Sequence, residues 1–283
     1  MTVAEVRSWP WSLWAAQIRA ILRLELGKTF FNRRAWWIYL AALAPVILTT
    51  GHSIATLYID QMSHGLHTDV KAYAGIFQFG YLRVFLFFGC AILFTNLFRG
   101  EVLAKTLHYY FLSPVRREVI AAGKYLAGLA AACVLYSVSV ALCHITTFMH
   151  FGPRFEEFYF AGGGLEQLAA YVGVTLLACI GYGAVFTLMG LLFKNPMIPA
   201  AVVMIWEGLN TFLPPALKKI SVVFYLKSLC PVDVPVPGPL SFLVQDAAPV
   251  PAWLAVPGVL LLSLLAVIYA GRRVRRFEIS YAE

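Results

Sequence analysis

Residues 99–124 read RGEVLAKTLHYYFLSPVRREVIAAGK, and this stretch decides how the rest of the chain is interpreted. It is a polar interruption with five basic residues, and strongly apolar segments lie on both sides of it. The segment from Glu101 to Leu112 predicts a short amphipathic helix that ends at Ser113-Pro114, because the residue before a proline is pushed out of the helical region. We therefore interpret residues 99–124 as a cytoplasmic connection between two membrane-spanning helices.

The composition is that of a polytopic membrane protein. Of the 283 residues, 60% are hydrophobic and only 13% are charged, and the mean hydropathy is +0.75. Several apolar runs reach the roughly 20 residues that a helix needs to cross a bilayer. These runs are continuous and do not alternate with polar residues, so they predict an all-α membrane protein.

The apolar runs predict six transmembrane helices in a single domain that covers residues 1–283. Gly173, Gly181, Gly183 and Gly190 are expected to allow close helix packing in the fourth span. The predicted spans cover residues 35–58, 74–98, 125–148, 168–193, 197–213 and 253–270.

Two further segments outside the spans are expected to lie at the membrane surface. In residues 1–34, Trp9, Trp11 and Trp14 predict an amphipathic helix in the interface, with the indole rings at headgroup level. Residues 214–252 form a long, proline-rich connection between the fifth and sixth spans. Its apolar pieces are too short to cross the bilayer and suit re-entrant or interfacial helices.

The basic residues predict the orientation in the membrane. Most of the 22 lysines and arginines lie before the first span, within residues 99–124 and after the sixth span. Cytoplasmic loops are enriched in lysine and arginine, so both termini are expected in the cytoplasm and residues 214–252 outside the cell (inner or plasma) membrane. This distribution explains the net charge of +8 without nucleic-acid binding.

Short motifs in the central connection and in the fifth span resemble those of ABC-2 type permeases, the membrane subunits of one class of ATP-binding-cassette transporters. The chain departs from that pattern at Lys105, where the family usually has glycine. The matching motifs are Glu101, Lys105-Thr106-Leu107, Leu112-Ser113-Pro114-Val115-Arg116, Gly123-Lys124 and Trp206-Glu207-Gly208-Leu209 followed by Leu213-Pro214.

The resemblance implies that the central connection is a coupling helix that docks on a separate ATPase subunit. It implies that two copies of the ATPase assemble with two permease chains. The permease chains are expected to form a homodimer in contact with membrane lipids. ATP and magnesium would be bound by the ATPase, and this chain would be no enzyme. The residues assigned to ATPase coupling by position are Glu101, Lys105, Thr106, Ser113, Pro114, Arg116 and Arg117.

The residues themselves agree that any ATP is bound elsewhere. Gly27-Lys28-Thr29 looks like the end of a phosphate-binding loop, but Leu22 stands where that motif needs a glycine. From the residues alone, the central connection is either a helix that receives force from a soluble partner or a solvated loop whose arginines only fix topology.

Arg83 and Glu207 are ionisable residues deep inside predicted spans. An intramembrane charge is costly and normally faces protein or water, so we expect the two side chains to pair within or between subunits. One interpretation is that the two residues line a substrate path or gate. The alternatives are that they form a structural ion pair, or that a long side chain snorkels to the outer interface.

Metal and haem sites are not favoured by the sequence. Asp60, His64, His67 and Asp69 form an external cluster, but no helical or strand register fixes them as ligands. The five cysteines show no CxxC spacing and are expected to be buried small residues, so the sequence predicts no metal site.

Two classes of function remain open. The first is the permease half of an ATP-driven exporter or extrusion machine. The second is a non-transporting membrane scaffold that transmits ATPase work to an external accessory protein through residues 214–252. A membrane-embedded enzyme is disfavoured, because no paired carboxylates and no nucleophile with a base lie at spacings that meet on one helix face.

Overall fold

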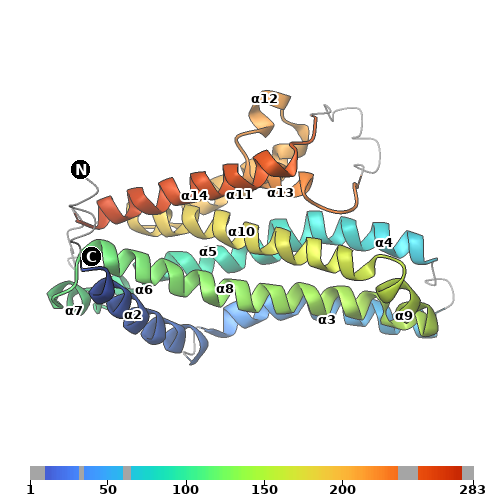
Figure 1. Cartoon of the computed structure of the whole chain (residues 1–283), viewed down its shortest axis with the longest axis horizontal. Coiled ribbons are helices and arrows are strands. Elements are labelled where there is room, and N and C mark those ends of the chain that lie inside the picture. Colours follow the sequence, from blue (N-terminus) through green and yellow to red (C-terminus); the bar gives the residue numbers. More distant parts are fainter. Residues whose placement is uncertain (1–9, 32–34, 60–64, 235–247, 276–283) are drawn as a thin grey trace.

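The computed structural model describes residues 10–31, 35–59, 65–234 and 248–275. Within these ranges, every regular element is helical and no strand is present. The long helices lie side by side in one elongated bundle (Figure 1). The predicted all-α fold is confirmed.

In the described ranges, five helical segments are long and apolar enough to cross a membrane. They agree with the predicted first, second, third, fourth and sixth spans, although several extend beyond the predicted bounds. The segments are α3 (Ala35–Tyr58), the continuous run of α4 (Leu66–Gly75), the π-helical η2 (Ile76–Leu86) and α5 (Phe87–Asn96), then α8 (Arg117–Phe148) continued by η3 (Met149–Phe151), α10 (Gly164–Leu192) and α14 (Ala252–Arg275).

The predicted fifth span, residues 197–213, is shorter than a full crossing. It consists of α11 (Met197–Leu209) and the 3-10 turn η4 (Asn210–Phe212). Leu213-Pro214 ends the helix, because Leu213 adopts an extended conformation before the proline. The count of six spans is therefore not confirmed.

The chain after α11 folds back toward the bundle. Two short helices follow, α12 (Pro215–Lys218) and α13 (Val222–Ser228). The second packs against α10 and α14, while α12 projects from the bundle (Figure 1). Short helices were expected in residues 214–252, and the described part of that connection contains these two.

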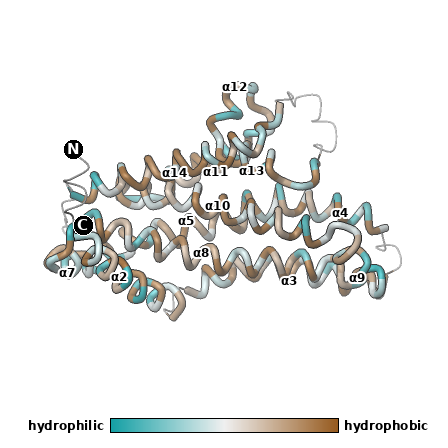
Figure 2. Tube along the Cα trace, viewed as in Figure 1, coloured by the Kyte–Doolittle hydropathy of each residue, from teal (hydrophilic) through white to brown (hydrophobic). Residues whose placement is uncertain are grey.

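The bundle has two different ends (Figure 1). At one end, here called the α7 end, lie α2 (Trp11–Phe31), α6 (Arg99–Leu103), α7 (Leu107–Leu112) and the last turns of α14. At the opposite α9 end lie α9 (Pro153–Phe160) and the start of α4. Figure 2 shows hydrophobic residues predominating along the long helices and hydrophilic stretches in α2 and α9.

The N-terminal helix α2 packs on α8. Ile21 and Glu25 of α2 are buried. The two helices approach closely at Gly123, where a Cβ atom would lie 3.0 Å from Cγ2 of Ile21. Trp11 is exposed, as expected for an interfacial ring, and Trp9 lies outside the described residues.

Glycines let α10 occupy the centre of the bundle. A Cβ atom on Gly190 would lie 2.9 Å from the carbonyl oxygen of Thr95 in α5, and one on Gly183 would lie 2.5 Å from the ring of Phe94. Gly181 faces Val222 and Val259 at 3.1 and 3.3 Å. The close-packing prediction is thus confirmed for these glycines, whereas it is wrong for Gly173, which has no such neighbour within 4 Å.

The contrast between two α10 glycines gives a test of this packing. Gly190→Ala should lower the free energy of unfolding by about 1–3 kcal/mol, because the methyl group meets the backbone of α5. Gly173→Ala is the matched control and should leave that free energy unchanged or raise it by up to about 1 kcal/mol through helix propensity. Denaturant titration in mixed micelles, followed by circular dichroism, measures both; equal effects would contradict the assigned helix contact.

Candidate functional site

The predicted single helix from Glu101 to Leu112 is two short helices. Lys105, between α6 and α7, has a left-handed backbone with a φ of 56°. The amide of Thr106 donates to the carbonyl of Glu101 at 2.9 Å, and the amide of Lys105 donates to that of Val102 at 3.1 Å. This pair of bonds is the Schellman arrangement that ends a helix and favours glycine at the left-handed residue. The helix breaks here although lysine stands in the glycine position.

The second predicted boundary is confirmed. Helix α7 ends at Leu112, and Ser113 has an extended backbone before Pro114. The Ser113 hydroxyl donates to the carbonyl of Tyr110 at 2.6 Å and so satisfies a terminal carbonyl of α7. The chain then enters α8 at Arg117.

A buried ion network fastens these short helices to the bundle. Lys124 of α8 is 0% exposed, and its Nζ lies 2.6 Å from Oε1 of Glu25 and 3.6 Å from Oε1 of Glu101. Lys28 of α2 lies 2.7 Å from the same Glu101 oxygen. The network therefore contains two carboxylates and two ammonium groups, drawn from α2, α6 and α8.

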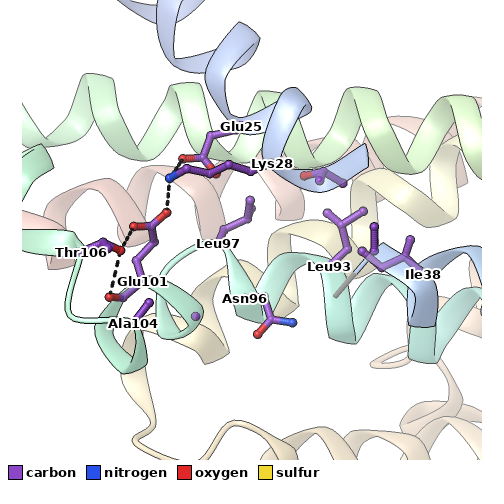
Figure 3. A pocket seen from close by; sticks show the side chains of 12 residues that line it. Glu25, Lys28, Ile38, Leu93, Asn96, Leu97, Glu101, Ala104 and Thr106 are labelled. Atoms are coloured by element: carbon purple, nitrogen blue, oxygen red, sulfur yellow. Dashed lines mark hydrogen bonds and ion pairs between the residues drawn. The ribbon is translucent and has the colours of Figure 1, made fainter. Parts of the chain in front are cut away.

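Hydrogen bonds complete this network. The Tyr110 hydroxyl of α7 donates to Oε1 of Glu25 at 2.5 Å and accepts from Nζ of Lys28 at 2.9 Å. The Thr106 hydroxyl donates to the other carboxylate oxygen of Glu101. Figure 3 shows Lys28 between the two carboxylates, with Thr106 on the far side of Glu101. The Tyr110 side chain thus holds helix α7 to α2.

The network sets the protonation of two of its members. Burial disfavours the charged form of Glu101, but Lys124, Lys28 and the Thr106 hydroxyl outweigh this effect and hold the pKa of Glu101 below its ordinary value. Burial raises the pKa of Tyr110, and its hydrogen bond to Glu25 raises it further. Glu101 therefore remains a carboxylate and Tyr110 a hydrogen-bond donor at neutral pH.

A cavity of about 290 Å³ lies beside the network, between α2, α3, α5 and α6 (Figure 3). Its walls are apolar at Ile38, Leu93 and Leu97, and charged at Glu101 and Lys28. No group of three or more metal-ligating side chains occurs among the described residues. The arrangement is suited to positioning helices.

The two predicted arginines beside α7 make surface contacts. Arg116 lies over the ring of Trp14 with 5.2 Å between the guanidinium carbon and the ring centroid. Arg117 donates to the carbonyl of Arg275 at 3.0 Å and lies 4.4 Å from the ring centroid of Phe111. These contacts join the start of α8 to α2, α7 and α14.

Arg83 and Glu207 do not form a direct ion pair within the described chain. Arg83, in the π-helical η2, donates to the carbonyl of Gly208 at 3.3 Å and to the hydroxyl of Thr211 at 3.0 Å. Its Nε atom is buried without a hydrogen-bond partner among the described residues. The predicted pairing within one subunit is therefore replaced by contacts to the residues that follow Glu207.

Glu207 instead caps the start of α13. Its carboxylate accepts from the backbone amides of Val222 at 3.0 Å and Val223 at 2.8 Å. It also accepts from the hydroxyls of Ser221 at 2.7 Å and Tyr182 at 3.2 Å. Amides at a helix N-terminus favour a negative charge, so Glu207 is structurally satisfied without a cation.

Only His67 and Asp69 of the external cluster lie within the residues that the structure describes. Asp60 and His64 lie outside the described residues. Asp69 lies 3.3 Å from Nε2 of His150 in η3. Asp69 thus links α4 to the end of the third long helix.

Sequence reasoning missed three members of the network. Glu25, Lys28 and Tyr110 were not predicted as site residues, and the partners of Lys124 were not identified. The available signal was Glu25, an acidic residue four positions after Ile21 and therefore on the same helical face as a buried apolar residue. The prediction of a purely interfacial helix left that face without a protein partner.

The buried ammonium group gives one test of the network. Lys124→Met should lower the free energy of unfolding by about 3–5 kcal/mol, because Glu25 loses its closest cation inside the protein. Adding Glu25→Gln should recover part of this loss. Lys71→Met, which removes an exposed lysine of α4, is the control and should change the value by less than about 0.5 kcal/mol. Strict additivity of the Lys124 and Glu25 effects would contradict the pairing.

The left-handed lysine gives a second test. Lys105→Gly should raise the free energy of unfolding by about 1 kcal/mol, because glycine adopts a positive φ without the Cβ clash. Lys105→Ala keeps the Cβ atom and removes the same charge, so it serves as the control and should give no such gain. Thermal unfolding in detergent compares them, and a gain of equal size in both variants would show that charge, not backbone conformation, is responsible.

The comparison with known families identifies the class of membrane protein. Residues 21–209 match the model described as ABC-2 family transporter protein. The match includes the network residues of α2, α6, α7 and α8. No curated protein that was compared matches the chain. Because the family match covers more than half of the sequence, the chain belongs to the ABC-2 family of transporter membrane proteins.

Proposed function

We propose that the chain is the permease subunit of an ATP-driven transporter and pairs with a separate ABC ATPase to export or extrude a substrate. Family membership and the apolar helices support a multi-pass membrane subunit. In this proposal, two copies of the chain assemble with two ATPases, which bind ATP and magnesium. The α7 end and both termini face the cytoplasm, and the bundle lies in the cell (inner or plasma) membrane.

The observation that carries the proposal is an exposed apolar tip on α7. Tyr109 and Leu112 are 68% and 79% exposed, although they lie outside the long apolar helices. Leu103 at the end of α6 is also exposed. Neighbouring exposed apolar side chains on a polar connection indicate a surface that binds another protein. A groove on the ATPase would cover them.

The attachment of α7 suits it to receive force. Tyr110 directly follows the exposed Tyr109 in α7, and its hydroxyl group forms hydrogen bonds with Glu25 and Lys28 of α2. Glu101 of α6 binds the same lysine and lies 3.6 Å from Lys124 of α8. A displacement of the tip is therefore passed through charged contacts to α2 and to the long helix α8. This route explains how ATPase closure would move the membrane part.

The second candidate function is a scaffold that transmits ATPase work to an external protein. The projecting α12 favours it, because Leu217 and the nearby Ile220 are exposed apolar residues there (Figure 1). Both functions require the contact between α7 and an ATPase, and they differ in what happens on the external side of the membrane. Transport requires a substrate to cross, whereas force transmission requires an external partner and no crossing.

Substitution at the α7 tip tests the ATPase contact. Tyr109→Ala combined with Leu112→Ala should abolish co-purification of an ABC ATPase with the full-length chain, because the apolar contact surface is lost. The ion network lies beneath the tip, so the folded chain should keep its unfolding temperature. Affinity purification from the native membrane with mass spectrometry measures this contact.

The matched control removes the same residue types, leucine and tyrosine, from the C-terminal end of α3, at the opposite end of the bundle from α7. Leu57→Ala combined with Tyr58→Ala also removes an exposed leucine and tyrosine, at the end of the bundle that we place outside. This variant should retain the ATPase. An ATPase retained by both variants, or absent from the unmodified chain, would reject the proposed contact.

A further inference from the structure

The final turns of α14 present an apolar face that leads into basic residues. Leu261, Leu265 and Tyr269 follow one another at four-residue intervals, so they lie along one face of the helix. All three side chains are more than half exposed. Arg272 and Arg273 lie three and four positions after Tyr269 and continue the same face toward the α7 end.

These basic residues form one wall of an open hollow. Tyr269, Arg272, Arg273 and Arg275 line a cavity of about 410 Å³. The helix end is fixed there, because Arg275 forms an ion pair with Glu118 of α8 and its carbonyl accepts from Arg117. Among the residues that the structure describes, Arg272 and Arg273 have no acidic partner within ion-pair distance. Within the described part of the chain, the hollow therefore combines an ordered wall with two arginines that no described carboxylate neutralises.

We propose that this hollow binds the head group of an anionic phospholipid. A guanidinium group matches a phosphate with two parallel hydrogen bonds, so Arg272 and Arg273 would hold the phosphate. Along the helix, Tyr269 lies between these arginines and the two leucines. This position would correspond to the headgroup level of the membrane, where tyrosine is favoured. The acyl chains would lie along Leu265 and Leu261.

The order of these residues along the helix favours a lipid over a free phosphate. Moving toward the α7 end, α14 presents two leucines, then a tyrosine, then two arginines. A phospholipid has the same order of acyl chain, ester region and phosphate. Basic pockets at the cytoplasmic ends of membrane helices are known to suit anionic head groups. The inference depends on a membrane position for α14 and not on an ATPase partner.

Lipid titration of the full-length chain tests the proposal. The purified, delipidated protein is titrated with phosphatidylglycerol or phosphatidylcholine, and bound lipids are counted by native mass spectrometry. The anionic lipid should bind more tightly. Arg272→Gln combined with Arg273→Gln should weaken its binding about 25-fold, from about five-fold for each arginine. Binding of phosphatidylcholine should remain unchanged.

A matched variant separates a specific site from general charge attraction. Arg19→Gln combined with Arg23→Gln removes two exposed arginines of α2 at the same end of the bundle. It should leave phosphatidylglycerol binding within about two-fold, since its effect at a separate surface is screened. Equal weakening by both double variants, or equal affinity of the unmodified chain for both lipids, would overturn the proposal.

Two additional arms keep the test decisive. Arg272→Lys combined with Arg273→Lys retains the charge and should show intermediate affinity, because lysine lacks the paired donors of arginine. This variant replaces the glutamine variant if the latter elutes as aggregate. Inorganic phosphate should not displace the lipid at equal concentration. Complete displacement by phosphate would show that the hollow binds a free anion and would reject a lipid site.

Discussion

The α7 end depends on the burial of one ammonium group. Lys124 is fully enclosed, and an unpaired charge inside a protein costs several kcal/mol. Glu25 must therefore lie against it, and Glu25 belongs to α2. Gly123 removes the side chain that would keep the two helices apart. Lys124, which needs a carboxylate partner, thus directly follows Gly123, which lets α2 approach closely. Together these two adjacent residues fix α2 to α8.

Two buried carboxylates in this chain are satisfied by different physical means. Glu25 faces Lys124, and the tyrosine hydroxyl of α7 donates to the same oxygen. Glu207 receives two backbone amides at the start of α13 together with two hydroxyl donors. Ion pairing therefore joins separate helices at the α7 end, whereas helix capping closes the turn after α11. Because four donors already reach its carboxylate, Glu207 is satisfied within the chain without a direct contact to Arg83, and a pair between subunits stays a prediction.

The sequence predicted the elements better than the contacts between them. Length and hydropathy are properties of a continuous segment, so the long helices were predictable. The end of α7 was predictable from Pro114, which acts on its immediate neighbour. The break at Lys105 was not, because the Schellman turn formed there with a residue that disfavours it. The partner of Lys124 was also not predictable, since Glu25 is 99 positions away and only the packing of α2 brings it near.

At the α7 end of the bundle, paired charges hold some helices together, and a cavity lies between others. Moving α7 away from α2 would separate Tyr110 from Glu25 and expose the charges beneath it. Beside these paired charges, the cavity of about 290 Å³ lies between α2, the start of α3, α5 and α6. A space without packed atoms forfeits dispersion contacts, so helices can shift across it at smaller cost. Under the proposed function, we expect an ATPase that pushes on α7 to move α7, α2 and the start of α8 together, because their charged side chains are paired, and to change the width of the cavity.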